Sequence, residues 1–302
     1  MMKIIPLASD SMGTRSMATL VITPDVRILI DPSAALGPRR YKLPPHEHEL
    51  LQLQKHKKRI EDAASESGVL IVTHYHFDHY DPGKVGMFSN KTALIKHPLE
   101  NINKSQKNRA DYFIEQMRPV AEVVEYADGR SFNVGATNIC FSQAVYHGTN
   151  NRLGYVVEVA ISDRGKVFVF TSDVEGAGID TQADFIIQSQ PDVTYIDGPM
   201  TYMLGYRYSY ASLKASIDHL IQIIEKSSLK TMILDHHLLR DLKWKKHIAP
   251  VFDAGVEHNV RVLTAAEYCG MENSMLEARR KELYLDPESH ISIQASARNG
   301  HP

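Results

Sequence analysis

Apolar and polar positions follow two different patterns along the chain. In the first half, short apolar runs are separated by turn residues, and in the second half such runs alternate with longer amphipathic segments. Runs of about four to eight Val-, Ile- or aromatic-rich residues bounded by turn signals are typical of strands. Strands are therefore predicted over residues 4–7, 18–22, 26–30, 69–73, 93–96, 121–126, 137–144, 155–161, 166–171, 193–196, 231–234 and 260–263.

Helical periodicity marks four longer segments. Residues 209–226 carry apolar side chains at intervals of three and four, which places them on one helix face. Helices are predicted over residues 45–66, 101–117, 209–226 and 241–258, and Pro250 should kink or divide the last of them. Strands first and β–α alternation afterwards indicate an α/β (α+β) protein in which helices cover two packed sheets.

Composition narrows the class of protein. The chain has 302 residues, 43% of them hydrophobic, and a formal net charge of −2. These values suit one globular domain over residues 1–285, and the polar, aperiodic residues 286–302 are expected to form a flexible tail. Without a surplus of Lys and Arg, a nucleic-acid partner is not favoured and a membrane partner is not expected.

Neither the N-terminal sequence nor the cysteines suggest export. The N-terminus lacks an apolar core with a small-residue cleavage site, and no apolar run approaches the length of a membrane span. Cys140 and Cys269 lie far apart and outside any CxxC pattern, so two buried free thiols are expected. A cytoplasmic protein is predicted.

Candidate metal ligands follow directly on one buried-type strand. His74, His76, Asp78 and His79 place four strong ligands within six residues, immediately after the predicted strand 69–73. Imidazole and carboxylate together suit zinc, iron or manganese. Where a strand ends and the chain turns, residues two apart can point to the same place. A metal site is therefore predicted at this end of the strand.

The spacing His74-x-His76-x-Asp78-His79 resembles the signature of the metallo-β-lactamase superfamily. The remaining motifs of that family have counterparts here in the right order. They are Asp31 after an apolar run, His147 before a glycine, Asp173 after a strand, and the pair His236-His237 after another. The resemblance implies the family's four-layer αβ/βα sandwich. Pro32 after Asp31 resembles the branch that includes L-ascorbate-6-phosphate lactonase, and the whole chain is similar to an archaeal group of metallo-β-lactamase-fold hydrolases.

By this resemblance the ligands divide into two sets that share one carboxylate. They are His74, His76 and His147 for a first metal, Asp78, His79 and His236 for a second, and Asp173 between the two. In RNA-processing members an arginine stands four residues after the last ligand, as Arg240 does after His236, and this favours His236 over His237. His237 would then line the pocket, and Asp31 would either orient the ligand loop beneath the site or simply end a strand.

The implied cofactor is two Zn²⁺ ions per chain, with Mn²⁺ or Fe as alternatives. A hydroxide bridging two metal ions would attack a carbonyl carbon or a phosphorus. Asp78 and His236 are the expected catalytic residues, Asp78 orienting the nucleophile. The predicted enzyme is a hydrolase that cleaves an ester, lactone or phosphoester bond in a small substrate.

Two loops are candidates for substrate recognition. Arg39 and Arg40 lie in a loop after Asp31, where they would suit a phosphate or carboxylate, although ordinary surface charges are the favoured interpretation. Residues 197–210 form an aromatic loop that includes Tyr206. Its tyrosines either rim the site or pack into the core.

Other functions remain as alternatives. The runner-up is a metal-dependent nuclease or phosphodiesterase acting on RNA or DNA. An alternative of another class is a mononuclear iron oxidoreductase built on the same His-x-His-x-Asp-His motif. A scaffold with a dead site is disfavoured because the full ligand set is present. A homo-oligomer stays open.

Overall fold

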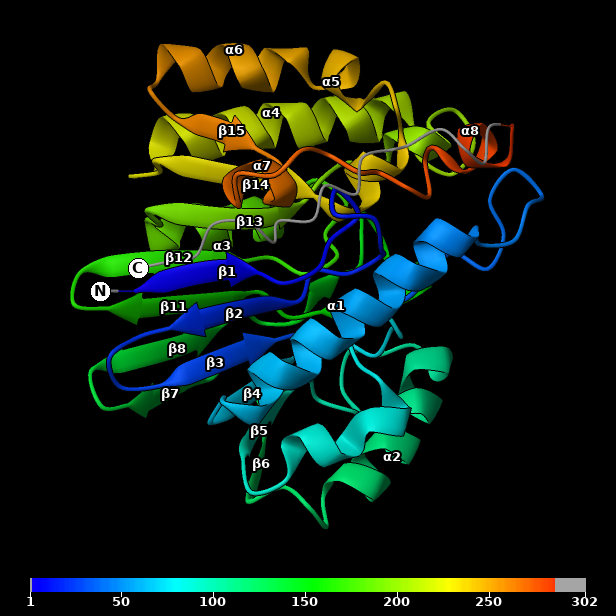
Figure 1. Cartoon of the computed structure of the whole chain (residues 1–302). Coiled ribbons are helices and arrows are strands. Elements are labelled where there is room, and N and C mark those ends of the chain that lie inside the picture. The colour runs from blue at the N-terminus through cyan, green and yellow to red at the C-terminus, as the bar shows by residue number, and fades with distance from the viewer. Residues whose placement is uncertain (1, 286–302) are drawn as a thin grey trace, which may run out of the picture.

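Two β-sheets pack against each other in the computed structural model, which describes residues 2–285. The six-stranded sheet has the order β1-β2-β3-β4-β5-β6, and the seven-stranded sheet has the order β15-β14-β13-β12-β11-β8-β7 (Figure 1). Strands β9 and β10 form a separate two-stranded ribbon. The predicted tail 286–302 lies outside the described residues.

The strands are short, and in chain order most of the helices follow or precede single strands. The first sheet consists of β1 (Lys3–Pro6), β2 (Thr19–Ile22), β3 (Arg27–Ile30), β4 (Val69–Val72), β5 (Thr92–Ile95) and β6 (Val123–Tyr126). The second consists of β7 (Ser131–Val134), β8 (Thr137–Phe141), β11 (Val159–Asp163), β12 (Lys166–Phe170), β13 (Val193–Asp197), β14 (Thr231–Asp235) and β15 (Arg261–Leu263), and the ribbon pairs β9 (Val145–Tyr146) with β10 (Tyr155–Val156). The α-helices are α1 (Glu47–Ser65), α2 (Lys104–Met117), α3 (Asp180–Ser189), α4 (Tyr210–Lys226), α5 (Trp244–His247), α6 (Ala249–Glu257), α7 (Ala265–Tyr268) and α8 (Arg280–Leu285).

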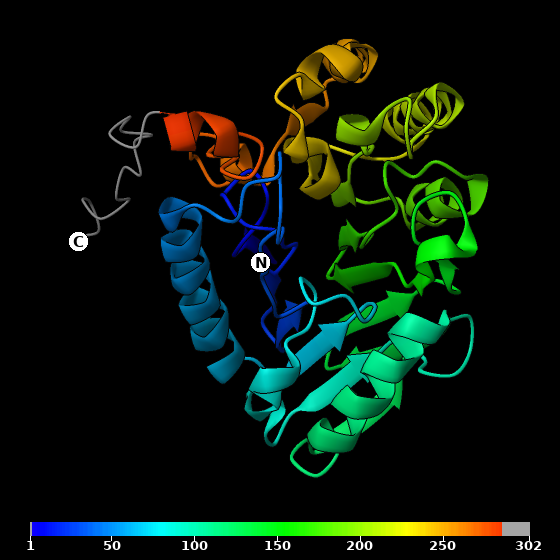
Figure 2. The same cartoon turned by 90° about the vertical axis from the view of Figure 1, so that its right-hand side faces the viewer.

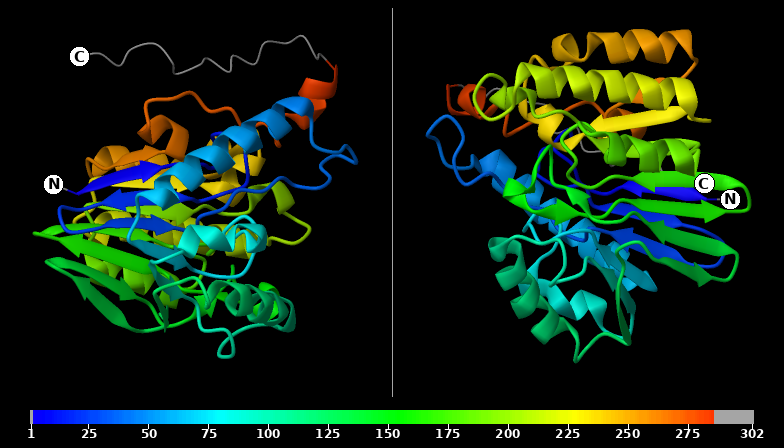
Figure 3. Two further views of the ribbon diagram at one scale, coloured as in Figure 1. Left: turned by 60° about the horizontal axis from the view of Figure 1, so that its bottom comes forward. Right: turned by 180° about the vertical axis from the view of Figure 1, so that it is seen from behind.

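Three apolar layers hold the elements together. The inner layer joins the two sheets, and Ile71 of β4 and Phe170 of β12 are among its fully buried members. A second layer packs α1 and α2 on the outer face of the first sheet, and a third packs α3, α4 and α6 on the outer face of the second. Figures 2 and 3 show these helices on opposite sides of the paired sheets. The predicted four-layer αβ/βα sandwich is therefore confirmed.

The break predicted at Pro250 is confirmed. The helix expected over residues 241–258 is divided into α5 and α6 at Ile248, because Pro250 can occupy only the first turn of a helix. Two other elements were missed for local reasons. Helix α3 was not predicted, since its first flanking residue, Ile179, provides no side-chain cap to mark the start. Strand β7 was also missed, because it is a short edge strand with no buried residue.

Cysteine pairing and membrane insertion can also be compared with the prediction. Cys140 and Cys269 are free, as expected, but both are half-buried rather than buried. Among residues 2–285, no helix combines the length and the apolar character that a membrane crossing requires.

The carboxyl ends of the central strands carry unusual backbone conformations. Asp31, Ser172 and His236 follow β3, β12 and β14, and their φ angles are 49°, 58° and 58°. Left-handed backbone is costly for residues other than glycine and persists where the surrounding structure holds it. These three residues turn the chain sharply at one end of the sandwich, where the candidate site lies.

Candidate metal centre

The ligands predicted from the sequence converge from four loops. The first four follow β4, and the others follow β9, β12 and β14. Their ligand atoms fall into overlapping groups in which all atoms lie within 4.8 Å of one another. One group is His74, His76, His147 and Asp173, and another is Asp78, His79 and His236.

Asp173 lies at the centre of this cluster. Its Oδ2 atom is 3.6 Å from His74 Nε2, 3.1 Å from His147 Nε2 and 3.5 Å from His236 Nε2. Its Oδ1 atom is 2.9 Å from His79 Nε2. One carboxylate therefore faces histidines of both groups, as a ligand shared by two cations would.

Several buried polar atoms of the cluster make no hydrogen bond with the residues that the structure describes. They include His74 Nε2, His79 Nε2 and Asp173 Oδ1, of which the last two face each other at 2.9 Å. Buried polar atoms are normally satisfied, so an unsatisfied set points to an absent ion or water. Nitrogen and carboxylate ligands suit zinc, iron or manganese. These residues therefore fit the divalent cations that the fold implies.

Asp31 holds the loop after β4, which carries His74 and His79, through several hydrogen bonds. It accepts hydrogen bonds from the Thr73 backbone N–H and the Thr73 hydroxyl at 2.8 and 2.7 Å. Its Oδ2 atom also lies 2.7 Å from His79 Nδ1. Ser172 holds His74 in a similar way, with Oγ 3.1 Å from Nδ1. Such partners fix the ring orientation and direct the other nitrogen toward a metal.

His236 is held in the same manner by a residue that the sequence did not single out. Its Nδ1 atom is 2.8 Å from Asp10 Oδ2, so its Nε2 atom faces Asp173 and, at 3.7 Å, Asp78. Arg240 pairs with the other oxygen of Asp10 at 2.8 Å and lies 3.2 Å from His236 Nε2. The residue four positions after His236 thus orients the ring through Asp10.

His237 has a different environment although it is adjacent in sequence. Its Nδ1 atom lies 2.9 Å from Asp197, and its ring lines the pocket. His237 also belongs to a third group with Asp173 and His236. The structure therefore brings both histidines to the cluster, but only His236 lies beside Asp78 and His79 in the second ligand group.

These two histidines can be separated by experiment. His236→Ala is expected to lower the metal content below that of the wild type, because the group of Asp78, His79 and His236 then keeps only two ligands of its own. His237→Ala should keep the metal content of the wild type while activity falls, because its ring lines the pocket. Elemental analysis of both variants provides the measurement. Loss of metal from His237→Ala, with none lost from His236→Ala, would reverse the assignment.

Burial and neighbouring charges set the protonation of the cluster. Burial disfavours the charged form of His79, but Asp173 and Asp31 outweigh it and raise the pKa to about 10. Burial, reinforced by His147, lowers the pKa of His76 to about 3. Although burial alone would raise the pKa of Asp173, the surrounding histidines hold that pKa well below its usual range. The central carboxylate is therefore ionised and ready to accept a cation.

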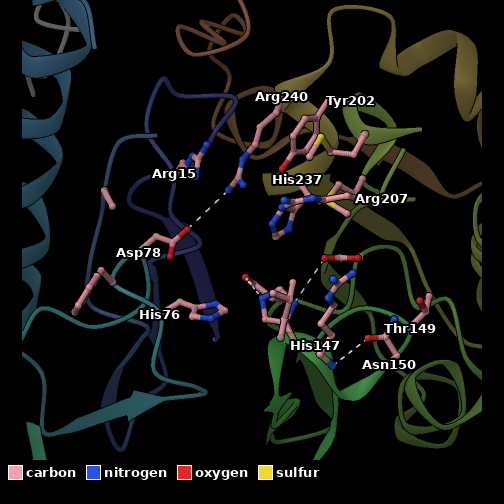
Figure 4. Close-up of a pocket in the computed structure, with 18 of the residues that line it drawn as sticks. Arg15, His76, Asp78, His147, Thr149, Asn150, Tyr202, Arg207, His237 and Arg240 are labelled. Atoms are coloured by element: carbon pink, nitrogen blue, oxygen red, sulfur yellow. Dashed lines mark hydrogen bonds and ion pairs between the residues drawn. The ribbon is translucent and has the colours of Figure 1, made fainter. Parts of the chain in front are cut away.

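A pocket of about 520 Å³ opens over the cluster (Figure 4). His76, Asp78, His147 and Asp173 contribute to its wall, and Arg240 reaches to within 3.8 Å of Asp78. The other lining residues come from both halves of the chain. They include Arg15, Leu36, Phe77, Arg109, Asn150, Arg152, Glu175, Met200, Tyr202, Met203, Arg207 and His237.

The two loops considered for substrate recognition divide between the alternatives that the sequence left open. Arg39 is exposed and does not line the pocket. Arg40 lies behind the pocket wall, donating to the Arg240 carbonyl oxygen at 2.9 Å with its guanidinium over the Tyr202 ring. Tyr206 is 78% exposed and also lies outside the pocket. In the aromatic loop, Tyr202 rims the site and Tyr208 packs inside.

Sequence reasoning missed several residues of the site. Asp197 ends β13 beside the site, and its position at the end of a buried strand, like that of Asp31 after β3, was a usable signal. Glu175 is buried with Oε1 3.7 Å from His147 Nδ1, and follows Asp173 closely enough to have been considered. Asp10 and Arg109 carry no such signal, because only the tertiary fold brings Asp10 to His236 and Arg109 to the pocket.

Solved structures with this architecture define the class of protein. The chain is similar to the metallo-β-lactamase fold protein YhfI from Bacillus subtilis, with 14% identity, a TM-score of 0.50 and coverage of 87% of this chain and 96% of that chain. It is similar to an isothiocyanate hydrolase from Delia radicum gut bacteria, with 14% identity, a TM-score of 0.52 and coverage of 83% and 94%. Unliganded yeast PDE1 gives 12% identity, a TM-score of 0.53 and coverage of 87% and 97%. The protein therefore has the metallo-β-lactamase fold.

Sequence relatives define the family within that class. The chain is 52% identical to a UPF0282 protein of Korarchaeum cryptofilum over 284 residues, which cover 94% of each chain. It is 44% identical to a UPF0282 protein of Saccharolobus solfataricus over 302 residues, covering 99% of this chain and 98% of the other. No protein-family profile matches the chain. The chain belongs to the UPF0282 family.

Proposed function

We propose that this protein is a hydrolase that uses two divalent metal ions to cleave an ester, lactone or phosphoester bond in a small molecule. The position of Asp173 between two groups of histidines is the observation that carries the proposal. The first ion would be held by His74, His76 and His147, and the second by Asp78, His79 and His236. Asp173 would contact both ions.

The bound cations would supply Lewis acidity and a water of lowered pKa. The protein's own residues hold the reacting groups in place. Asp31, Ser172 and Asp10 orient ligand histidines through their Nδ1 atoms. Asp78 lies at the pocket wall, where its carboxylate can accept a hydrogen bond from the attacking water and orient it. His237 is neutral because burial lowers its pKa. Its ring lines the pocket, where it can form a hydrogen bond with the substrate.

Two further observations support this class of reaction. One neighbour of the same fold is named an isothiocyanate hydrolase, so the architecture is compatible with hydrolytic chemistry. The pocket volume of about 520 Å³ also falls within the range typical of small-molecule sites, which is roughly 300–1,000 Å³. This volume favours a small substrate over a polymer.

Metal content and hydrolysis measured on one preparation test the proposal. Protein purified without added metal or chelator should contain about two zinc or manganese ions per chain. It should hydrolyse at least one member of a panel of phosphate esters, phosphodiesters, lactones and carboxylic esters, and a chelator should abolish the activity. A single iron per chain, together with oxygen consumption on a sulfur substrate, would count against the hydrolase and favour an oxidoreductase.

A further inference from the structure

Five arginines line the pocket, but they differ in their charge partners. Arg15 forms a two-pronged ion pair with Glu277, with both distances 2.6 Å. Arg240 is paired with Asp10 at 2.8 Å. These two positive charges are thus neutralised by the protein itself, and their role at the pocket is structural.

The other three pocket arginines have no such partner. Arg109, Arg152 and Arg207 form no ion pair with any carboxylate among residues 2–285. Arg152 and Arg207 are exposed, and Arg109 is half-buried. The pocket mouth therefore presents three uncompensated guanidinium groups, although the whole chain carries a formal net charge of −2.

Arg109 is held rigidly in this position. Its guanidinium lies 4.7 Å from the centroid of the Phe77 ring and donates to the Tyr75 carbonyl oxygen at 3.2 Å. Both contacts attach it to the loop that carries His74 and His76. A stacked guanidinium keeps further donors in a fixed plane, the geometry that suits the oxygens of a phosphate or carboxylate.

Helix α2 also brings Arg152 to the same wall. Gln106, on the turn of α2 before Arg109, donates to the Leu153 carbonyl oxygen at 2.7 Å. Asn103, which caps α2, donates to the carbonyl oxygen of Arg152 itself at 3.3 Å. Arg207 comes from the aromatic loop on the other half of the chain (Figure 4).

We infer that the substrate is a small organic anion whose phosphate or carboxylate group, remote from the scissile bond, is bound by Arg109, Arg152 and Arg207. The inference rests on the proposed function, because it assumes that the bond to be cleaved lies over the metal ligands. Phe77 is 50% exposed beside Arg109, and Met200, Met203 and Tyr202 line the pocket as well. The part of the substrate between its anionic group and its scissile bond should therefore be apolar or contain a ring.

Calorimetric titration of full-length, metal-loaded protein tests this inference without any need for turnover. The probes are inorganic phosphate, succinate and a short RNA oligonucleotide. Arg109→Gln and Arg152→Gln should each weaken binding of the preferred small anion about tenfold, and the triple variant with Arg207→Gln about a hundredfold or more. Arg39→Gln, which removes an exposed arginine outside the pocket, is the matched control and should bind as the wild type does.

The outcomes separate this inference from the proposed function. A preference for phosphate or for succinate, lost in the triple variant, supports the inference and identifies the anionic group, whether or not hydrolysis has been found. Unchanged affinity in the triple variant overturns it even if the protein is an active hydrolase. Equal weakening by Arg39→Gln, or dependence on the three arginines for RNA alone, also overturns it.

Discussion

Asp173→Ala is expected to remove both metal ions and to lower kcat/KM by about a hundredfold or more. Loss of a residue that only supports a metal ligand already costs about 10- to 100-fold in metal affinity or activity. Asp173 faces His79 at 2.9 Å and His147 at 3.1 Å, so its loss takes a shared ligand and a negative charge from both groups at once. His76→Ala should be less severe for metal content, because His76 belongs to one group only. Elemental analysis, steady-state kinetics and circular dichroism provide the measurements.

A matched control for Asp173→Ala lies on helix α3. Asp184 is an exposed aspartate outside the pocket, and Asp184→Ala should keep metal content, activity and the circular dichroism spectrum of the wild type. Full metal content in a folded Asp173→Ala protein would contradict the assignment of Asp173 as the shared ligand.

The second large effect is expected in stability, at an ion pair far from the metal ligands. Arg280 of α8 and Glu49 of α1 have no exposed side-chain surface, and two contacts of 2.7 Å join them. Arg280 also donates to the carbonyl oxygens of Leu43 and Gly37. The pair therefore ties the last described helix to α1 and to the loop in front of it.

Arg280→Met should lower the free energy of unfolding by about 3–5 kcal/mol, because it leaves the Glu49 carboxylate buried without a partner. Urea denaturation followed by circular dichroism provides the measurement. Arg279→Met is the matched control, since Arg279 pairs with Glu282 near the surface. Its expected cost is about 1 kcal/mol or less.

A double variant distinguishes an unpaired charge from lost packing. Arg280→Met combined with Glu49→Leu should recover a substantial part of the stability lost in Arg280→Met, because no buried charge then remains unpaired. If Arg280→Met costs no more than Arg279→Met, the buried pair does not contribute as described.

The same end of the chain also shapes the pocket wall. Glu277, three residues before Arg280, pairs with Arg15, and Gly37 lies against that pair. A Cβ atom at Gly37 would come within 2.4 Å of the Arg15 guanidinium and 2.7 Å of the Glu277 carboxylate, so only glycine fits without a shift. Ala35, which lines the pocket, is joined to Arg15 by two backbone hydrogen bonds of 3.0 and 2.9 Å. The C-terminal segment thus stabilises the loop beside the metal centre.

The sequence by itself was sufficient for the class of fold and for the candidate ligands. Strand β4 and the four ligands after it are contiguous, so one apolar run and the turn that follows fix their proximity. His147, Asp173 and His236 were identified through the resemblance to the metallo-β-lactamase superfamily, whose remaining motifs have counterparts at these positions in the same order.

Side chains that support the ligands were decided by the tertiary structure. Asp10 orients His236 and pairs with Arg240, yet these residues are separated by most of the chain. No periodicity in the sequence predicts such a contact, because it depends on how β14 and the loop after β1 pack together. The choice between His236 and His237 depends on this packing in the same way.

Residues that could bind the substrate were likewise decided by the tertiary structure and not by the sequence pattern. The basic loop containing Arg39 was a reasonable prediction from sequence, but the arginines without a charge partner at the pocket are Arg109, Arg152 and Arg207. They come from a helix, a 3-10 turn and an aromatic loop. The sequence shows whether each segment has the periodicity of a helix or a strand, and which candidate ligands stand at its ends. The net charge of a pocket depends instead on which of its residues form ion pairs with residues from distant parts of the chain. Only the tertiary structure determines that pairing, because ion pairs form by proximity in space.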